Sequence, residues 1–177
     1  NSPSDNAIFD IAEDKNGDLW FAGFEHGLTR FNQHTGKFTK YPTLSKDNNP
    51  YYGIRRIVND AEGNLWIATA GRGLAKYNFE KDTFDFYYPN PDKQTDGTVR
   101  NYNNVTDILQ DKTDNNILWV GTQVGLYSFD KSDNQFTFYP SGFAELIFKP
   151  FMVINAIAQD KNHLLWLGTY GNGLYCF

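Results

Sequence analysis

The chain has 177 residues, of which 40% are hydrophobic and 21% are charged, and this composition fits one folded domain rather than a disordered tail. Its net charge is −5, and 16 Lys and Arg against 21 Asp and Glu do not supply the basic face that a nucleic-acid partner requires. The single cysteine excludes an intrachain disulfide and a four-cysteine zinc site. Aromatic residues make up 17% of the chain, which together with 15 glycines favours β-structure with many tight turns.

An internal repeat organises the whole sequence. The four tryptophans lie at positions 20, 66, 119 and 166. Each follows a segment that begins with an isoleucine and has an aspartate three residues later. After each tryptophan come a small residue and then a Gly-Leu pair, and in three copies an aromatic segment that ends in Tyr-Pro. Four short strand-like segments at a spacing of roughly 50 residues are typical of propeller blades.

In chain order, the first repeat predicts strand A over 8–12, strand B over 19–22, strand C over 27–31 and strand D over 37–41. The same pattern recurs, so the repeats run over about 6–42, 52–89, 103–140 and 152–177, within one propeller segment that spans 1–177. The expected fold is therefore all-β: a β-propeller fragment of four-stranded blades, with three complete blades plus strands A–C of a fourth. We interpret it as part of a larger propeller or, alternatively, as part of a ring that a second copy completes.

An aspartate opens the turn between strands A and B in every repeat. Its side chain can accept hydrogen bonds from the turn amides, and Gly17 and Gly63 supply the positive φ that such turns need. Recurrence in all repeats indicates a structural role for these residues, which are Asp14, Asp60, Asp111 and Asp160.

The repeated segment Asp-x-x-Gly-x-Leu-Trp, followed by a small residue and Gly-Leu, resembles the two-component regulator propeller repeat. Residues 119–126 and 166–174 match it best. The resemblance implies a periplasmic, non-catalytic ligand-sensing module of a hybrid two-component system of gut bacteria, whose parent chain would be a sensor histidine kinase. It implies an oligosaccharide derived from a glycan as the ligand, and attachment to the membrane only through other parts of the parent chain.

The D–A and B–C loops of a propeller emerge on one face, and loops on a rigid scaffold commonly carry function. Sugar recognition needs aromatic rings for the C–H face of the ligand and planar polar groups for its hydroxyls. The candidate ligand-binding residues on these loops are Glu25, His26, Tyr51, Tyr52, Arg55, Arg72, Arg100, Asn101, Tyr102, Gln123, Tyr170 and Asn172.

Two alternatives are a scaffold for protein–protein association, with the rest of the propeller or a second copy as partner, and a propeller glycoside hydrolase or lyase. A hydrolase would need two carboxylates at a controlled separation, and the loop carboxylates show no shared pattern. The histidines map to opposite faces, with His26 on one and His34 and His163 on the other, so we expect no metal site and no cofactor.

The residue before the repeated isoleucine of strand A is Asp10, Arg56, Asp107 or Ala156. If the A strands line the axis, three of these residues form a row of alternating charges. We interpret this row as a salt-bridged channel wall, because a buried arginine needs carboxylate partners.

Overall fold

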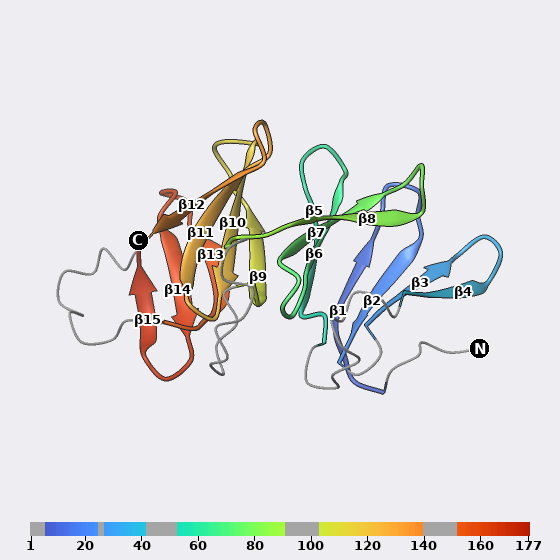
Figure 1. The fold of residues 1–177 in the computed structure, drawn as a ribbon, viewed down its shortest axis with the longest axis horizontal. Helices are drawn as coiled ribbons and strands as arrows, with labels where there is room; N and C mark the ends of the chain where they lie inside the picture. Colours follow the sequence, from blue (N-terminus) through green and yellow to red (C-terminus); the bar gives the residue numbers. More distant parts are fainter. Residues whose placement is uncertain (1–5, 25–26, 42–52, 91–102, 140–151) are drawn as a thin grey trace.

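Fifteen antiparallel strands form four separate sheets in the computed structural model, which describes residues 6–24, 27–41, 53–90, 103–139 and 152–177. The first two blades contain β1 (Ile8–Glu13), β2 (Leu19–Gly23), β3 (Leu28–Asn32), β4 (Lys37–Tyr41), β5 (Arg56–Asn59), β6 (Leu65–Ala68), β7 (Leu74–Asn78) and β8 (Thr83–Tyr87). The other two contain β9 (Val105–Gln110), β10 (Ile117–Thr122), β11 (Gly125–Asp130), β12 (Gln135–Tyr139), β13 (Ile154–Gln159), β14 (Leu165–Thr169) and β15 (Gly173–Cys176). The predicted three complete blades and three-stranded fourth are confirmed (Figure 1).

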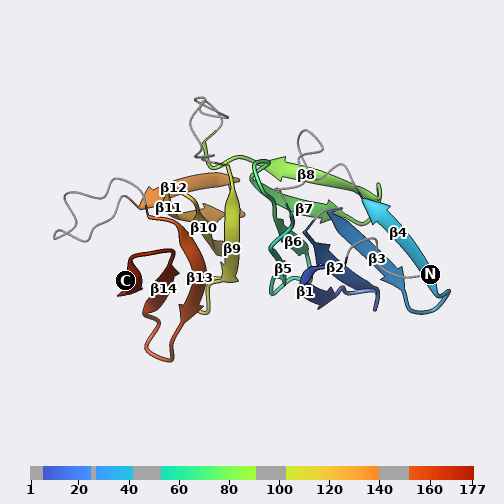
Figure 2. The ribbon, with the colours of Figure 1, turned by 90° about the horizontal axis from the view of Figure 1, so that it is seen from below.

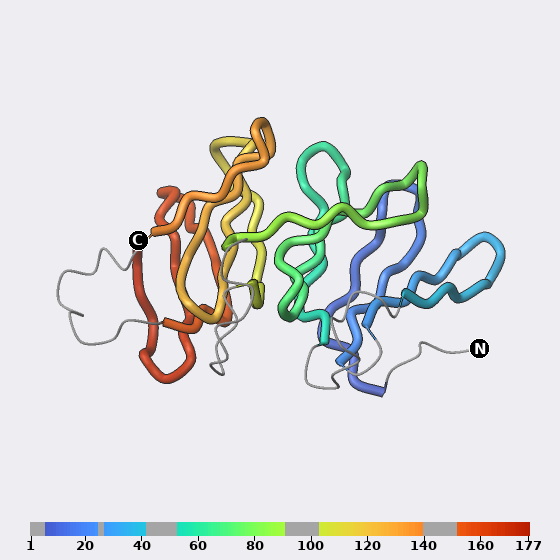
Figure 3. The backbone as a smooth tube through the Cα atoms, in the orientation of Figure 1, coloured from blue at the N-terminus to red at the C-terminus, as the bar shows by residue number. Residues whose placement is uncertain are grey.

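Each blade is a meander in which consecutive strands pair with one another (Figure 3). The A strands of successive blades, β1, β5, β9 and β13, contact one another in that order. They lie on the inner side of the row of blades, and the D strands β4, β8 and β12 lie on the outer side (Figure 2). No helix in the described part of the chain is long and apolar enough to cross a membrane.

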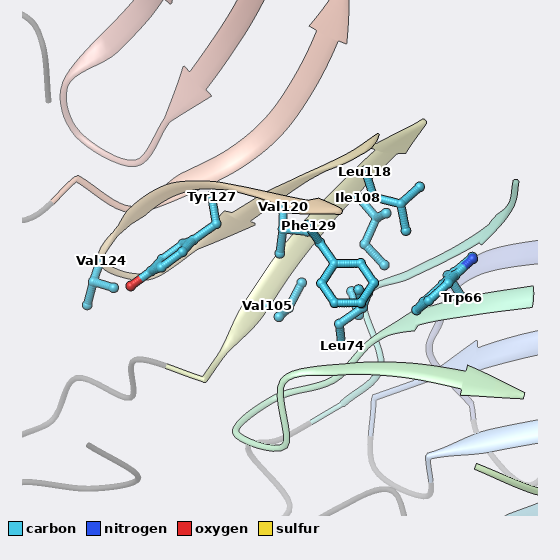
Figure 4. Packing of buried hydrophobic residues seen from close by; sticks show 10 residues of the cluster. Trp66, Leu74, Val105, Ile108, Leu118, Val120, Val124, Tyr127 and Phe129 are labelled. Atoms are coloured by element: carbon cyan, nitrogen blue, oxygen red, sulfur yellow. The ribbon is translucent and has the colours of Figure 1, made fainter. Parts of the chain in front are cut away.

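The blades are held together by apolar layers that repeat along the row. In each layer the tryptophan of strand B and the leucine of strand C of one blade pack against the following blade. The isoleucine of strand A packs in the opposite direction, against the preceding blade. Figure 4 shows the central layer, where Trp66 and Leu74 of the second blade meet Ile108 and Phe129 of the third.

Small residues two positions after the tryptophan permit this close approach. A Cβ atom added to Gly121 would lie 2.9 Å from Cγ2 of Ile154 in the next blade, which is closer than real side chains approach. β6, which has blades on both sides, is buried along its whole length. The predicted continuous apolar character of strand B therefore reflects burial on both faces.

Blade faces without a neighbour among the described residues remain exposed. Ile11 of the first blade is 58% exposed, although its equivalents Ile57, Ile108 and Ile157 are buried. On the fourth blade, Trp166 and Leu174 are 38% and 65% exposed. Burial of these positions is thus decided by the neighbouring blade and not by the sheet to which they belong.

The aspartate of the A–B turn joins the turn to the tryptophan of its own blade. One oxygen of Asp14 accepts hydrogen bonds from the amides of Asn16 and Asp18, and the other accepts one from Nε1 of Trp20 at 2.6 Å. The same indole–carboxylate bond recurs at 2.8, 2.6 and 3.1 Å in the other three blades. Gly17 and Gly63 have φ values of 80° and 76°, and His163 takes the equivalent place with a φ of 68°.

Asp60 has a further partner, because Nζ of Lys131 in the next blade lies 2.9 Å from its carboxylate and both side chains are buried. Burial alone would raise the pKa of Asp60, but hydrogen bonds from Trp66, Asn64 and Lys131 outweigh it and lower the pKa to about 2. This aspartate therefore links the A–B turn of the second blade to the third blade.

Replacement of Asp60 by Asn should lower the free energy of unfolding by about 3 kcal/mol, because it leaves the buried Lys131 ammonium with only the exposed Glu62 carboxylate, 3.4 Å away, as a counter-charge. Urea unfolding followed by tryptophan fluorescence measures this loss. The matched control is Asp160→Asn, which removes the same turn carboxylate from the exposed fourth blade and should have a smaller effect. Equal losses in the two variants would contradict the role of Lys131.

Stability should also depend on pH through Asp60. Because its pKa falls from 3.8 to about 2 on folding, its contribution is fully present above pH 3.8 and is lost as the pH falls toward 2. Unfolding measured from pH 6 to pH 2 should therefore show a shallower acid loss for Asp60→Asn than for the wild type. Parallel curves for the two proteins would show that Asp60 does not supply this dependence.

Candidate functional site

Backbone hydrogen bonds join the B–C loops to the segments that precede the A strands, on the lower face in Figure 1. Within a blade, the amide of Phe24 donates to the carbonyl of Ala7 at 3.1 Å. In the same way, the amide of Tyr170 donates to the carbonyl of Val153 at 3.0 Å. Between blades, the amide of Ile54 in the second blade donates to the carbonyl of Gly23 in the first blade at 3.0 Å. The third blade makes the equivalent backbone hydrogen bond to the second. These bonds give the face, which we call the loop face, a fixed backbone.

A threonine three residues after the tryptophan closes the B–C loop in three of the blades. The Oγ1 atoms of Thr69, Thr122 and Thr169 donate at 2.7, 2.8 and 2.7 Å to the carbonyl oxygens of Gly73, Gly125 and Gly173. This role was not predicted from the sequence, although threonine recurs at this position in three of the four repeats. The first blade has Gly23 there, and the amide of Gly23 donates to the carbonyl of Gly27 at 2.8 Å.

Five of the predicted ligand-binding residues are described, and all five lie on or beside the loop face. Arg72 is half-buried with its guanidinium 4.1 Å from the centroid of the Phe86 ring, and Tyr170 is 75% exposed. Gln123 and Asn172 are half-buried, and Arg55 is exposed. The predicted residues outside the described part of the chain are Glu25, His26, Tyr51, Tyr52, Arg100, Asn101 and Tyr102.

A β-bulge in strand A presents one additional residue of each blade near this face. The register shifts at Phe9, Thr106 and Asn155, and in the second blade Arg55 and Arg56 both lie opposite Ala68. A bulge of this kind re-aims a side chain while the rest of the strand keeps its pairing. The bulge positions therefore carry side chains that differ from blade to blade on an otherwise repeated backbone.

Three of the residues near the first two blades form a cluster, which we call the Phe9 cluster. The ring of Phe9 lies 5.6 Å from that of Phe24 in an edge-on arrangement, and Cζ of Arg55 lies 5.8 Å from the Phe9 centroid. Phe9 is nevertheless 50% exposed. Only Arg55 was predicted from the sequence, because the bulge that exposes Phe9 interrupts the regular alternation of strand A.

The row of charges predicted on the A strands is present. Arg56 lies 3.8 Å from a carboxylate oxygen of Asp10 and 3.3 Å from one of Asp107. Each aspartate also accepts the amide hydrogen of the repeated isoleucine in the next blade, at 2.8 Å from Ile57 and 2.6 Å from Ile157. Burial raises the pKa of Asp107 despite these bonds and the charge of Arg56. The row therefore holds adjacent A strands together.

A second group of titratable residues lies between the first two blades. Oδ1 of Asp82 accepts hydrogen bonds from the hydroxyls of Tyr41 and Tyr77, each at 2.6 Å, and Arg30 donates to Tyr77 at 2.6 Å. Burial and the bond to Asp82 raise the pKa of Tyr77 to about 12, and the two tyrosine hydroxyls lower the pKa of Asp82. Shifted pKa values can mark an active site. Here the shifted pKa values result from a hydrogen-bond network. It connects the turn that contains Asp82 in the second blade to strand D of the first blade.

No group of three His, Cys, Asp or Glu side chains among the described residues has the geometry of a metal site. His34 and His163 lie on turns at the end of the blades opposite the loop face, and both are exposed. Cys176 is exposed and pairs with Trp166 across strands, at the position held by Arg30, Lys76 and Ser128 in the other blades.

Comparison with protein families identifies three segments of the chain. Residues 2–25, 46–71 and 149–171 match the model described as two component regulator propeller. The third repeat, whose A–B turn has two extra residues, lies outside these matches. No curated protein matches the chain.

Several solved structures have the same fold. Two extracellular domains from B. thetaiotaomicron, described as those of the hybrid two component systems BT3049 and BT4673, superpose with TM-scores of 0.65 and 0.70 at 22% identity. They match 97% and 100% of this chain, which spans 20% and 22% of their own lengths. A catalytically inactive virginiamycin B lyase from Staphylococcus aureus, solved with quinupristin, gives 0.62 at 16% identity over 99% of this chain and 57% of the lyase. One fold therefore serves both sensors and an enzyme, and function must be argued from the site.

The loop face should depend on Gly73, which has a φ of 74° and lies where an added Cβ would be 2.2 Å from the carbonyl oxygen of Tyr87. Gly73→Ala should therefore destabilise the protein severalfold more than Gly171→Ala. Gly171 has a similar φ of 80° and no atom within 4 Å of the added Cβ, so its substitution adds only backbone strain of about 1 kcal/mol. Urea unfolding of both variants compares the two effects, and similar losses would show that the close approach to Tyr87 is unimportant.

Proposed function

We propose that this chain, of which residues 2–25, 46–71 and 149–171 match the two component regulator propeller model, is a non-catalytic sensing module of a two-component receptor. In this proposal it lies outside the cytoplasmic membrane, in the periplasm, and belongs to a longer chain that includes a histidine kinase and the membrane attachment. Its ligand is an oligosaccharide derived from a glycan. The similar extracellular domains of B. thetaiotaomicron support the sensing role and the location.

One observation carries the proposal: variable polar and aromatic side chains lie on a repeated, hydrogen-bonded loop face. The backbone bonds between loops recur from blade to blade, whereas the side chains there differ, as in Arg72, Gln123 and Tyr170. A purely structural surface has no need for such variety. Aromatic, guanidinium and amide groups together suit a ligand with both C–H faces and hydroxyl groups.

A sensor must convert binding into a change of state. A ligand shifts an equilibrium between two receptor arrangements only by the difference between its affinities for them. The fixed backbone of the loop face makes a large rearrangement inside a blade costly. The module would therefore act by favouring one arrangement of whole receptor chains, with its own fold unchanged.

A thermal-shift screen against plant, host and microbial oligosaccharides tests this function. One glycan class should raise the melting temperature in a saturable manner, because a ligand that binds only the folded state stabilises it. Tyr170→Ala should reduce the shift. Lys161→Gln, on the opposite face, should leave it unchanged and is the control. Chromatography of the same mixtures checks for turnover.

The outcomes separate the alternatives. Release of shorter sugars would replace the sensor proposal with a glycoside hydrolase or lyase. A complete lack of response to every glycan class would overturn the proposed ligand.

Association with another blade of the same repeat is a second function, which the exposed end faces favour. Ile11 on one end and Trp166 and Leu174 on the other are the two halves of the apolar layer that recurs three times between the blades. Two such faces are complementary and not identical, so contact between them is head-to-tail. For the isolated chain, we propose that the occupant of the Trp166 face is the first blade of a second copy.

Sedimentation velocity over a range of concentrations measures this association. Ile11→Glu and Leu174→Glu should each weaken it strongly, because each places a charge in the apolar layer. A mixture of the two variants should still form a dimer, since one intact face of each kind remains. A mixture that stays monomeric, while the wild type associates, would show that the contact is not head-to-tail.

A further inference from the structure

We propose that the Phe9 cluster is a subsite for a negatively charged sugar residue, with Arg55 binding its carboxylate or sulfate and Phe9 packing against its ring. The inference rests on the proposed function, since it places an acidic sugar in the ligand of the loop face. Carboxylate and sulfate share the chemistry that matters here, which is planar or compact oxygen groups that accept hydrogen bonds from a guanidinium.

Arg55 forms no ion pair with a carboxylate in the described part of the chain. Its side chain is exposed, and the contact that fixes it is with the face of the Phe9 ring, 5.8 Å away. Two other arginines differ: Arg30 lies 3.7 Å from Asp18, and Arg56 lies between two aspartates. A guanidinium over an aromatic ring keeps its N–H groups free to donate in its own plane.

Nearby carboxylates are already engaged and do not compete for Arg55. In Asp10, one oxygen accepts the amide of Ile11 and the other accepts that of Ile57 and lies near Arg56. In Asp107, the amides of Ile108 and Ile157 bind one oxygen each. Their side chains are only 18% and 10% exposed, whereas Arg55 is exposed, so Arg55 is the charged group that an anion from solvent can reach.

Phe9 supplies the second requirement, an exposed apolar surface beside the cation. A bulge directs this side chain toward Phe24 and Arg55 and leaves half of it exposed. Phe9 and Phe24 together form an apolar surface beside the cation, and grouped apolar surface of this kind is typical of a binding site. A sugar ring offers a flat C–H face of suitable size for this ring.

Equivalent positions in the other blades show that the backbone does not require these residues. The third blade has Thr106 at the bulge, buried and bonded to the carbonyl of Ile154, and the fourth has Asn155. Both residues occupy the same bulge position, and neither has an aromatic ring or a charge. The pairing of Phe9 with Arg55 is thus particular to the boundary between the first two blades.

The test is calorimetric titration of the wild-type protein with an oligogalacturonate and with its fully methyl-esterified form, which keeps the ring and removes the charge. A sulfated galactan oligosaccharide forms the other arm and distinguishes sulfate from carboxylate. The acidic sugar should bind about tenfold or more tightly than its ester, and the preference should weaken between 50 and 300 mM salt.

Variants locate the effect. Arg55→Gln should remove the preference for the acidic form while weak binding of the ester persists, and Phe9→Ala should weaken both. Lys161→Gln removes one surface charge from the opposite face, and Leu164→Ala removes an exposed apolar side chain from a turn on that face. Both controls should bind as the wild type does.

The two proposals fail in different ways. Equal binding of acid and ester, or an unchanged preference in Arg55→Gln, overturns the acidic subsite and leaves glycan sensing intact. Binding of neutral oligosaccharides without binding of acidic ones would likewise overturn the acidic subsite and leave glycan sensing intact. If neither the charged nor the neutral sugars bind, both the proposed function and this subsite are wrong.

Discussion

The structure depends on an apolar layer between neighbouring blades, in which the tryptophan of one sheet meets the isoleucine strand of the next. A four-stranded sheet with two apolar faces cannot bury both of them alone, so each blade needs a neighbour on each side. Truncation of one fully buried tryptophan of this kind costs about 4 kcal/mol, which is a large share of the stability of a typical domain. The A–B turn is part of the same layer, because its aspartate accepts the indole N–H that burial would otherwise leave unpaired.

Charged residues reinforce these layers at their edges. Asp107 and Arg56 join adjacent A strands, Lys131 joins the third blade to the turn of the second, and Asp82 joins the second blade to Tyr41 of the first. All three contacts cross from one blade to the next. Arg56 contributes to two boundaries, since it also lies 3.8 Å from Asp10 of the first blade, whereas the contacts of Lys131 and Asp82 each belong to one boundary.

The loop face combines a repeated backbone with side chains that do not repeat. Threonine hydroxyls and backbone amides close the B–C loops in the same way in successive blades, and this leaves the side chains beyond them unconstrained by folding. A ligand site can develop at such positions without loss of stability. The Phe9 cluster illustrates the principle, since a single bulge exposes an aromatic ring beside an arginine while the pairing of the strand continues.

The fold could be predicted from the residues alone, because the interval between tryptophans, the turn aspartates and the Gly-Leu pairs each reflect a local requirement of a four-stranded blade. Strand A was predicted over 8–12 and extends over Ile8–Glu13, and strand D coincides with its predicted range of 37–41. The sequence also identified Asp10, Arg56 and Asp107 as neighbours, since the repeat places them at one register.

Which of the equivalent residues are buried depends on the packing of neighbouring blades and could not be predicted from the repeat. Ile11 and Ile57 have the same place in the repeat, yet one is exposed and the other buried, because among the described residues a preceding blade lies beside Ile57 and none lies beside Ile11. The packing of the blades also places Phe9 beside Arg55. That contact crosses from one blade to the next through a bulge, and neither the bulge nor the approach of the two blades is encoded in the local alternation of residues.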